Sequence, residues 1–194
     1  DHLPDAWERA HFGMTNLSEG DLGDPDGDGT GNLQEYGQGS SPTDFYNGEL
    51  PFLSIVSGDG QVAVESNTFL PNPLVVEVSS GVGQLPGAPL RFEVSAGIGL
   101  LSLTNDGSGL GPAIDLRADG NGTARAWLFY GSSTSIWITV TAQSGTSAAS
   151  VVFSAILCNG DIDSDGLQDA WEMAFFGNMA QTGQDDPDGD GRNN

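Results

Sequence analysis

The amino-acid sequence predicts a mainly β chain, in which a Greek-key β-sandwich is flanked by small modules of acidic loops and short helices. Three observations lead to this prediction. Short runs of alternating apolar and polar residues fill the centre of the chain, turn-forming residues separate them, and both ends carry the same acidic and aromatic motif. We therefore divide the 194 residues into an N-terminal repeat module (1–48), a sandwich (49–158) and the start of a further repeat module (159–194).

The sandwich is predicted from the alternation of apolar and polar side chains, which places alternate residues on opposite faces of a strand. The clearest predicted strands are Leu74–Val78, Leu90–Val94, Ala124–Tyr130, Ile136–Val140 and Val151–Phe153. Turn-forming residues cluster between them, at Ser57–Gly60, Pro71–Pro73, Gly87–Pro89, Asn105–Gly107 and Asp119–Gly122. About seven short strands in roughly a hundred residues are typical of a two-sheet sandwich with Greek-key connections.

The chain is strongly acidic, with 27 aspartate and glutamate residues against 5 lysine and arginine residues and a net charge of −22. Nucleic-acid phosphates and anionic membranes repel such a surface, so we expect neither partner. No stretch has the length of a transmembrane helix and no signal peptide is recognisable, so we expect a mature or excised piece without direct membrane insertion. The acids are either a solvated surface or ligands for cations, and their spacing distinguishes the two.

The single cysteine, Cys158, excludes an intrachain disulfide. A protein that works in an oxidising space without disulfides needs another stabilising element, and a bound metal ion is the obvious candidate. We expect Cys158 itself to be a small buried residue at the end of a strand.

The two ends of the chain are copies of one motif. Asp1–Glu8 matches Asp165–Glu172, and a Phe-Gly pair follows in both copies. Further on, the run Asp24–Gly29 recurs as Asp186–Gly191. The chain thus begins inside one acidic motif and ends inside another, and we expect it to be one period of a tandem array with an overlap.

Residues 24–35 match a twelve-residue EF-hand calcium loop at every ligand position, and residues 161–172 match it again. In such a loop alternate acidic side chains point toward the ion, a glycine at position 6 allows the sharp turn, and position 7 offers its backbone carbonyl. The expected ligands are Asp24, Asp26, Asp28, Thr30, Asn32 and Glu35 in the first loop and Asp161, Asp163, Asp165, Leu167, Asp169 and Glu172 in the second.

Both termini carry incomplete copies of this loop. Asp1, Asp5 and Glu8 occupy positions 5, 9 and 12 of a loop whose start is missing, with His2 in place of the glycine at position 6. In a loop whose end is missing, positions 1, 3, 5, 7 and 9 are Asp186, Asp188, Asp190, Arg192 and Asn194.

The expected ligand atoms are all oxygens, which favours Ca²⁺ over zinc or copper, while Mg²⁺ prefers to keep its waters. The alternative interpretation is a run of turn-forming aspartates and glycines without an ion. A short helix is expected after each complete loop and none before the first. The helix after the second loop is expected to end at Gly177, and the helix that carries Leu33 and Tyr36 at Gly37. We expect Trp7 to pack as core against the helix that carries Leu33 and Tyr36, with carbohydrate stacking by Trp7 or Trp171 as the alternative role.

These residues resemble known families. The pattern DGLxDxWE…FG…DPDGDGxxNLQEY, at Asp1–Tyr36 and again at Asp165–Asn194, is similar to the thrombospondin type 3-like and dockerin-like calcium repeats of large bacterial surface proteins. The centre resembles bacterial Ig-like domains of the invasin/intimin type, on Phe69–Val76, Pro89–Val94, Leu116–Ala124 and Ala148–Ala155. The two resemblances imply an Ig-like sandwich between EF-hand-like modules, a location outside the cell, and a spacer or adhesive role without a reaction.

The sequence leaves three classes of function to compare: a structural module, a recognition module and an enzyme. The leading hypothesis is a structural module whose joints are rigidified by calcium, with neighbouring copies of the module as partners in a covalent array or a head-to-tail filament. The alternative is an adhesin or dockerin-like recognition module with a protein or glycan ligand. We do not expect an enzyme, because the acids lie in metal-spaced loops and both histidines, His2 and His11, lie in the N-terminal repeat.

Overall fold

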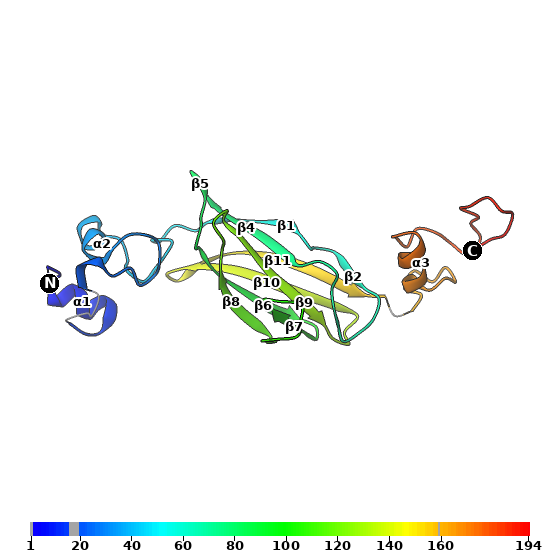
Figure 1. Ribbon diagram of the computed structural model, residues 1–194, viewed down its shortest axis with the longest axis horizontal. Coiled ribbons are helices and arrows are strands. Elements are labelled where there is room, and N and C mark those ends of the chain that lie inside the picture. The colour runs from blue at the N-terminus through cyan, green and yellow to red at the C-terminus, as the bar shows by residue number, and fades with distance from the viewer. Residues whose placement is uncertain (1, 16–19, 159) are drawn as a thin grey trace.

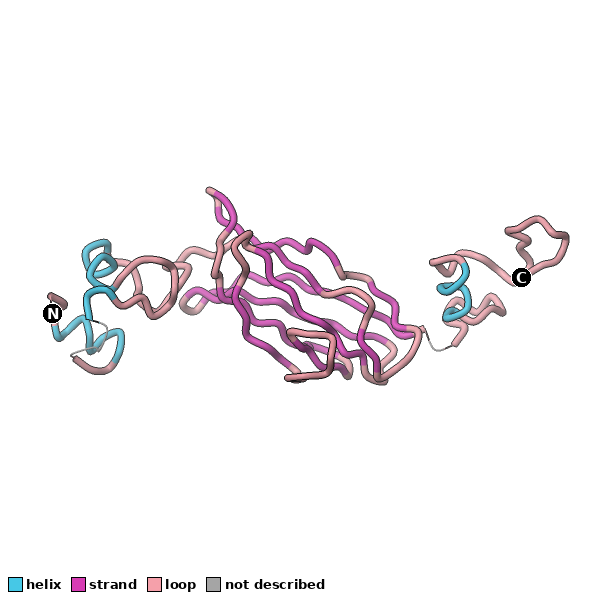
Figure 2. Tube along the Cα trace, in the orientation of Figure 1, coloured by secondary structure: helices cyan, strands magenta, loops and turns pink. Residues whose placement is uncertain are grey.

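The computed structural model describes residues 2–15, 20–158 and 160–194. A β-sandwich forms the centre of an elongated molecule, and the short helices lie beyond its two opposite ends (Figure 1). Figure 2 shows that the chain at both ends is mostly loop, with the strands confined to the centre. The acidic motifs therefore lie at the two ends of one sandwich.

Two sheets form the sandwich. The first has the order β1 (Phe52–Ser57), β4 (Leu74–Ser80), β9 (Thr123–Tyr130) and β3 (Thr68–Phe69), while β5 (Gly83–Gln84) pairs with β4 and β7 (Gly99–Ser102) pairs with β9. The second has the order β2 (Gln61–Ala63), β11 (Ser147–Leu157), β10 (Ser135–Ser144), β6 (Pro89–Ala96) and β8 (Ala113–Arg117). The pairs are antiparallel, except that β2 runs parallel to β11.

This strand order is that of an immunoglobulin-like domain. β1, β4, β9 and β7 correspond to strands A, B, E and D, and β11, β10, β6 and β8 correspond to G, F, C and C′. The prediction of a mainly β chain with antiparallel sheets is confirmed. The parallel β2–β11 pair was not predicted, because three residues, Gln61–Ala63, are too short for a periodic signal.

The alternation in the sequence places one row of each strand in the core. In β10 every second residue faces inward, and the inward row is Ile136, Ile138, Val140 and Ala142, all fully buried. The largest apolar side chains that meet them from the other strands are Tyr130, Phe92, Phe153, Leu74 and Leu128. Because both sheets contribute inward rows, one continuous core fills the space between them.

Among the described residues, three α-helices and one 3₁₀ turn belong to the flanks: α1 (Asp5–Phe12), η1 (Gly20–Leu22), α2 (Asn32–Gln38) and α3 (Asp169–Phe175). The expectation that Gly37 ends the second helix is wrong, because α2 continues to Gln38 and Gly39, with φ of 75°, is the left-handed cap. Gly37 lacks a positive φ, so it tolerates the helix interior. The 3₁₀ turn before the first loop was likewise not expected. Within the described residues, no helix has the length and apolar character needed to cross a membrane.

Candidate metal-binding loops

The three loops that begin at Asp24, Asp161 and Asp186 fold alike. In each, the backbone amide at position 6 donates a hydrogen bond to the carboxylate at position 1. The amides of Gly29, Gly166 and Gly191 donate to Asp24, Asp161 and Asp186 at 3.0, 2.9 and 2.9 Å. The same glycines have φ of 91°, 98° and 85°. A side chain at these positions would be strained, which explains the glycine in all three copies.

A second contact closes each loop at its base. The amide at position 9 donates to the carbonyl of the residue that precedes the loop. The distances are 2.8 Å from Asn32 to Gly23, 2.9 Å from Asp169 to Gly160, and 2.9 Å from Asn194 to Asp185. The same closing contact therefore occurs in all three loops.

The acidic side chains converge inside the loops. One carboxylate oxygen from each of Asp24, Asp26 and Asp28 lies within 4.8 Å of the others. The same limit holds for the second and third loops, in the groups Asp161, Asp163 and Asp169; Asp163, Asp165 and Glu172; and Asp186, Asp188 and Asp190. Two oxygens on opposite sides of a Ca²⁺ ion lie about 5 Å apart, because each bond measures roughly 2.4 Å. The carboxylates of each group therefore lie close enough together for one such ion to contact them all.

Burial separates the two complete loops from an ordinary acidic surface. Glu35, Asp169 and Glu172 are 0% exposed, Asn32 is 1% exposed and Asp26 is 7% exposed. In the described chain, eight buried oxygens of these two loops have no hydrogen-bond partner: Asp26 Oδ2, Asn32 Oδ1, both Glu35 Oε, Asp165 Oδ2, Asp169 Oδ2 and both Glu172 Oε. A buried polar atom without a partner costs about 1–3 kcal/mol, and a charged one more. Such a concentration of acceptors fits a cation.

The same burial disturbs the titration of the acids. Burial, followed by repulsion from Asp26, Asp28 and Asp24, raises the pKa of Glu35 to about 7. Burial and repulsion from Asp165 and its neighbours also raise the pKa of Glu172. The pKa of Asp26 is raised for the same reason, burial first. These carboxylates are held in positions where their negative charge is unfavourable unless a cation joins them.

The third loop lacks this burial. Asp186, Asp188, Asp190 and Arg192 are exposed and Asn194 is half-buried. Thr30 and Leu167, at position 7 of the complete loops, each donate their amide to the aspartate at position 5, at 2.7 and 2.8 Å. Arg192 makes the same contact with Asp190 at 2.8 Å. The ligand side chains of the third loop thus have the shape of a site but remain open to water.

The N-terminal broken loop departs from the pattern. Asp1 lies outside the described residues. Asp5 is exposed, and its carboxylate lies 3.2 Å from the guanidinium of Arg9 one turn later. Glu8, in contrast, is 1% exposed. The amide of His2 donates to Asp21 at 2.9 Å, and this bond and the contact of the His2 ring lower the pKa of Asp21.

The expected contact between α1 and α2 is present, but it is not core packing, because Tyr36 is 45% exposed. Trp7 of α1 contacts Tyr36 of α2, with ring centroids 5.9 Å apart. Cys158 is fully buried directly after β11, as expected, and burial raises the pKa of its thiol to about 11.

Sequence reasoning missed Asn47 and Arg117, which contact the first loop. An Asn-Gly pair and one of 5 basic residues were the available signals.

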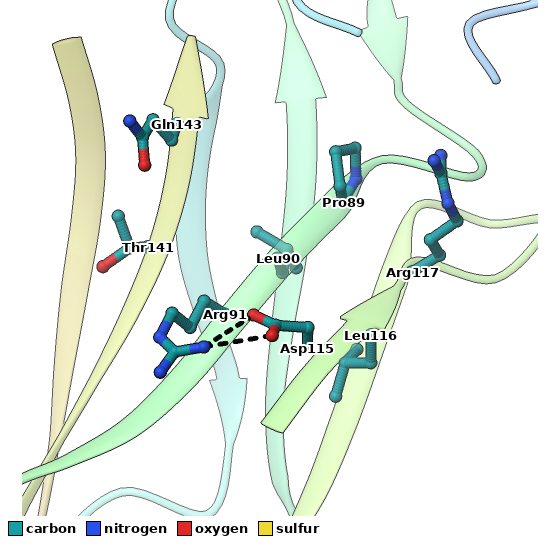
Figure 3. A pocket seen from close by; sticks show the side chains of 8 residues that line it. All are labelled: Pro89, Leu90, Arg91, Asp115, Leu116, Arg117, Thr141 and Gln143. Carbon is teal, nitrogen blue, oxygen red and sulfur yellow. Dashed lines mark hydrogen bonds and ion pairs between the residues drawn. The ribbon is translucent and has the colours of Figure 1, made fainter. Parts of the chain in front are cut away.

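A pocket also lies on the second sheet, lined by side chains of three neighbouring strands (Figure 3). It has a volume of about 440 Å³ and lies between β6, β8 and β10. Its main polar contact is an ion pair in which Arg91 donates to both oxygens of Asp115, at 3.0 and 3.1 Å. These charges satisfy each other, so the pocket carries less chemistry than the loops.

No family model matches the chain, and no curated protein sequence is significantly similar to it. Among solved structures, the D0-D1 domain of intimin matches with a TM-score of 0.41 and 14% identity, over 56% of this chain and 48% of that chain. The D00-D0 domain of intimin matches with a TM-score of 0.38 and 13% identity, over 54% of this chain and 46% of that chain. A conjugative transposon lipoprotein from Bacteroides eggerthii matches with a TM-score of 0.38 and 13% identity, over 53% of this chain and 93% of that chain. The chain spans about half the length of the intimin structures, and the assignment of its fold rests on the strand order described above.

Proposed function

We propose that this chain is a calcium-binding structural module of a repetitive bacterial surface protein, in which Ca²⁺ rigidifies the joints next to an Ig-like sandwich. The eight buried oxygens without partners in the two complete loops carry this proposal. Ca²⁺ takes six to eight oxygen ligands, and side chains plus the position 7 carbonyl of each loop offer that number. The module would work outside the cell, where calcium concentrations suit sites with dissociation constants of about 10⁻⁴–10⁻³ M.

The physical role of the ion follows from the charges. Without a cation, the clustered carboxylates of each loop repel one another and their buried oxygens stay unsatisfied. A site with calcium about tenfold above its dissociation constant stabilises the folded state by roughly 1.4 kcal/mol. The two complete loops lie at opposite ends of the sandwich (Figure 1), so this stabilisation applies at both joints.

The test is a thermal unfolding experiment in millimolar calcium and in excess chelator, monitored by calorimetry and circular dichroism. We expect calcium to raise the unfolding temperature of the flanking modules and the double variant Glu35→Gln with Glu172→Gln to lose most of that rise. The matched control is Glu65→Gln, which changes an exposed glutamate of the sandwich and should keep it. Superimposable unfolding curves with calcium and with chelator would refute the proposal.

Neighbouring copies of the module are the proposed partners. A covalent tandem array and a head-to-tail filament of separate chains both place one sandwich after another along a line. The intact mass of the native protein separates them, because an array is a single chain many periods long.

Recognition of a protein or glycan is the second candidate function. One observation favours it: Trp171 and Phe175 of α3 are 37% and 69% exposed, with ring centroids 5.0 Å apart. Aromatic faces of this kind bind sugars and apolar side chains. A change in tryptophan fluorescence on adding soluble glycans, abolished by Trp171→Leu but not by Trp137→Leu, would support it.

A further inference from the structure

The first acidic loop is fastened to the sandwich by Arg117, at the end of β8. One terminal nitrogen of its guanidinium donates to the carbonyl of Asp26 at 2.7 Å, and the other donates to the carbonyl of Gly87 at 2.8 Å. The guanidinium carbon also lies 5.9 Å from the centroid of the Phe45 ring. A planar fork is needed to span two carbonyls in this way, so arginine joins a metal-loop residue to the sandwich where lysine could not.

Asn47 makes the second connection. Its side-chain nitrogen donates to Asp28 Oδ2 at 2.8 Å, while its side-chain oxygen accepts from the amide of Ser41 at 2.9 Å. The two contacts fix which way the amide points. The backbone of Asn47 is left-handed, with φ of 51°, and its amide donates to the carbonyl of Asp44 at 2.8 Å. Asn47 is therefore held rigidly against a proposed calcium ligand.

The connection continues into the sandwich. Asp44 accepts from the hydroxyl of Ser144 at 2.8 Å, and Ser144, at the end of β10, is only 3% exposed. The same hydroxyl accepts from the amide of Gly48 at 2.9 Å. The hydroxyl of Tyr46, which is 7% exposed, donates to the carbonyl of Pro89 in β6 at 2.7 Å. The segment between the first loop and β1 is thus anchored at several points.

The second loop provides a contrast at the equivalent position. Asp165 stands at position 5, like Asp28, and its Oδ1 accepts from Leu167 as Asp28 accepts from Thr30. Its Oδ2 is buried and has no hydrogen-bond partner among the described residues. An equivalent of Asn47 is therefore missing at Asp165 within the described chain, whereas the carboxylate of Asp28 is bonded to Asn47 in the segment anchored to the sandwich.

We infer that Asn47 and Arg117 are positioning residues that couple calcium in the first loop to the docking of the N-terminal module on the sandwich. The inference rests on the proposed function. Asn47 orients the carboxylate of Asp28 and Arg117 fixes the backbone at Asp26, so both preorganise the ligand set. By reciprocity, an ion that holds Asp26 and Asp28 in place also stabilises the contact of Arg117 with Asp26 and the contact of Asn47, in the segment anchored to the sandwich, with Asp28.

The three loop glycines allow each site to be observed separately. The amides of Gly29, Gly166 and Gly191 donate to a ligand carboxylate of their own loop, so their NMR signals report binding loop by loop. In a titration with buffered calcium, Asn47→Gly removes the side chain but keeps the left-handed backbone without strain. The matched control is Asn67→Gly, at the left-handed Asn67 of the sandwich, with φ of 59°.

We expect Asn47→Gly to raise the calcium concentration at the midpoint of the Gly29 response by about tenfold or more, as loss of an outer-shell ligand contact typically does. Arg117→Lys, which retains the charge but loses the fork, should shift the same response. The responses of Gly166 in both variants, and of Gly29 in Asn67→Gly, should remain those of the wild type. In chelator, both variants should retain the unfolding temperature of the sandwich, which separates positioning from a general loss of stability.

A second readout follows docking itself. The amide of Ser41 is bonded to the Asn47 side chain, so calcium should slow its hydrogen exchange in the wild type and not in Asn47→Gly. An unchanged Gly29 midpoint in Asn47→Gly and Arg117→Lys refutes the coupling while leaving calcium binding intact. Equal shifts at Gly29 and Gly166 refute it as well. If the amide signals of the loop glycines in the wild type do not change when calcium is added, the proposed function is refuted, and the coupling with it.

Discussion

Lowering the pH from 7.5 to 5.5 should weaken calcium binding at the first loop far more than it would if every ligand carboxylate had its ordinary pKa. The cause is Glu35, whose pKa is raised to about 7 by burial and by the charges of Asp26, Asp28 and Asp24. A proton on this carboxylate competes directly with the ion, because both need the same oxygens. The proton must leave before Glu35 can bind.

The size of the effect follows from the fraction of Glu35 that is deprotonated. With a pKa of about 7, simple competition lowers the apparent affinity about 25-fold between pH 7.5 and pH 5.5. A glutamate at its ordinary value of 4.5 would change the affinity only by about 10% over the same interval. The two cases differ by more than an order of magnitude, which an ordinary titration resolves.

The assay is a buffered calcium titration at the two pH values, read at the amide of Gly29. Glu35→Gln is the control, because it should bind calcium more weakly at both pH values and lose most of the pH dependence. A calcium affinity, read at Gly29, that changes less than about threefold between the two pH values would refute the reasoning, because the pKa of Glu35 would then not be raised by burial and by the neighbouring aspartates.

The same carboxylate links stability to pH when calcium is removed. A group whose pKa is raised by folding contributes stability that is present below its unfolded value, here about 4.5, and lost as the pH rises through about 7. The chelated N-terminal module should therefore unfold at a lower temperature at pH 7.5 than at pH 5.5. Calcium should reverse that order, and melting curves at the two pH values with and without chelator test the sign.

Three further predictions concern particular residues. In Gly29→Ala the added methyl group has room, but the φ of 91° strains an alanine backbone, so the first loop should bind calcium more weakly in a calcium titration. In Gly37→Ala the residue lies inside α2 without a positive φ, so thermal unfolding should show a helix stabilised by up to about 1 kcal/mol. Leu128→Ala should destabilise the sandwich by about 2–5 kcal/mol in urea unfolding, because Leu128 is fully buried in the core, and a loss below about 1 kcal/mol would contradict that burial. Cys158 is fully buried with a pKa of about 11, so a thiol reagent at pH 8 should label it only after unfolding; rapid labelling of the folded chain would count against its burial.

The long strands could be predicted from the sequence because their apolar residues alternate over many positions. β9 and β10 each present a clear inward row, and no other element type buries such a row. The short strands β3 and β5 have two residues each and carry no periodicity, so their pairing depends on the strands beside them. The end of α2 could not be predicted for a related reason. A glycine ends a helix where its backbone is left-handed, and the sequence alone does not tell whether Gly37 or Gly39 adopts that conformation.

The acidic loops could be predicted position by position because their contacts are local. The bond from Gly29 to Asp24 spans only five residues, and the pattern of aspartates states it directly. Asn47 and Arg117 are different, since Arg117 reaches Asp26 across 91 positions and only the sandwich topology brings them together. Asp5 stays a prediction from its motif position, and its exposed carboxylate pairs with Arg9 one turn later on the same helix, a contact that the motif does not indicate.

If the module is placed under tension, the parallel pairing of β2 with β11 sets the direction in which their bonds are loaded. The flanking modules lie at opposite ends of the sandwich, so tension along the molecule pulls the early strands one way and β11 the other (Figure 1). The bonds between Gln61–Ala63 and Ala155–Leu157 then resist sliding along the strand direction, in shear, and must break together rather than peel apart singly. The additional bonds from Gly60 to Ser154 and from Cys158 to Ala63 extend this clamp at both ends.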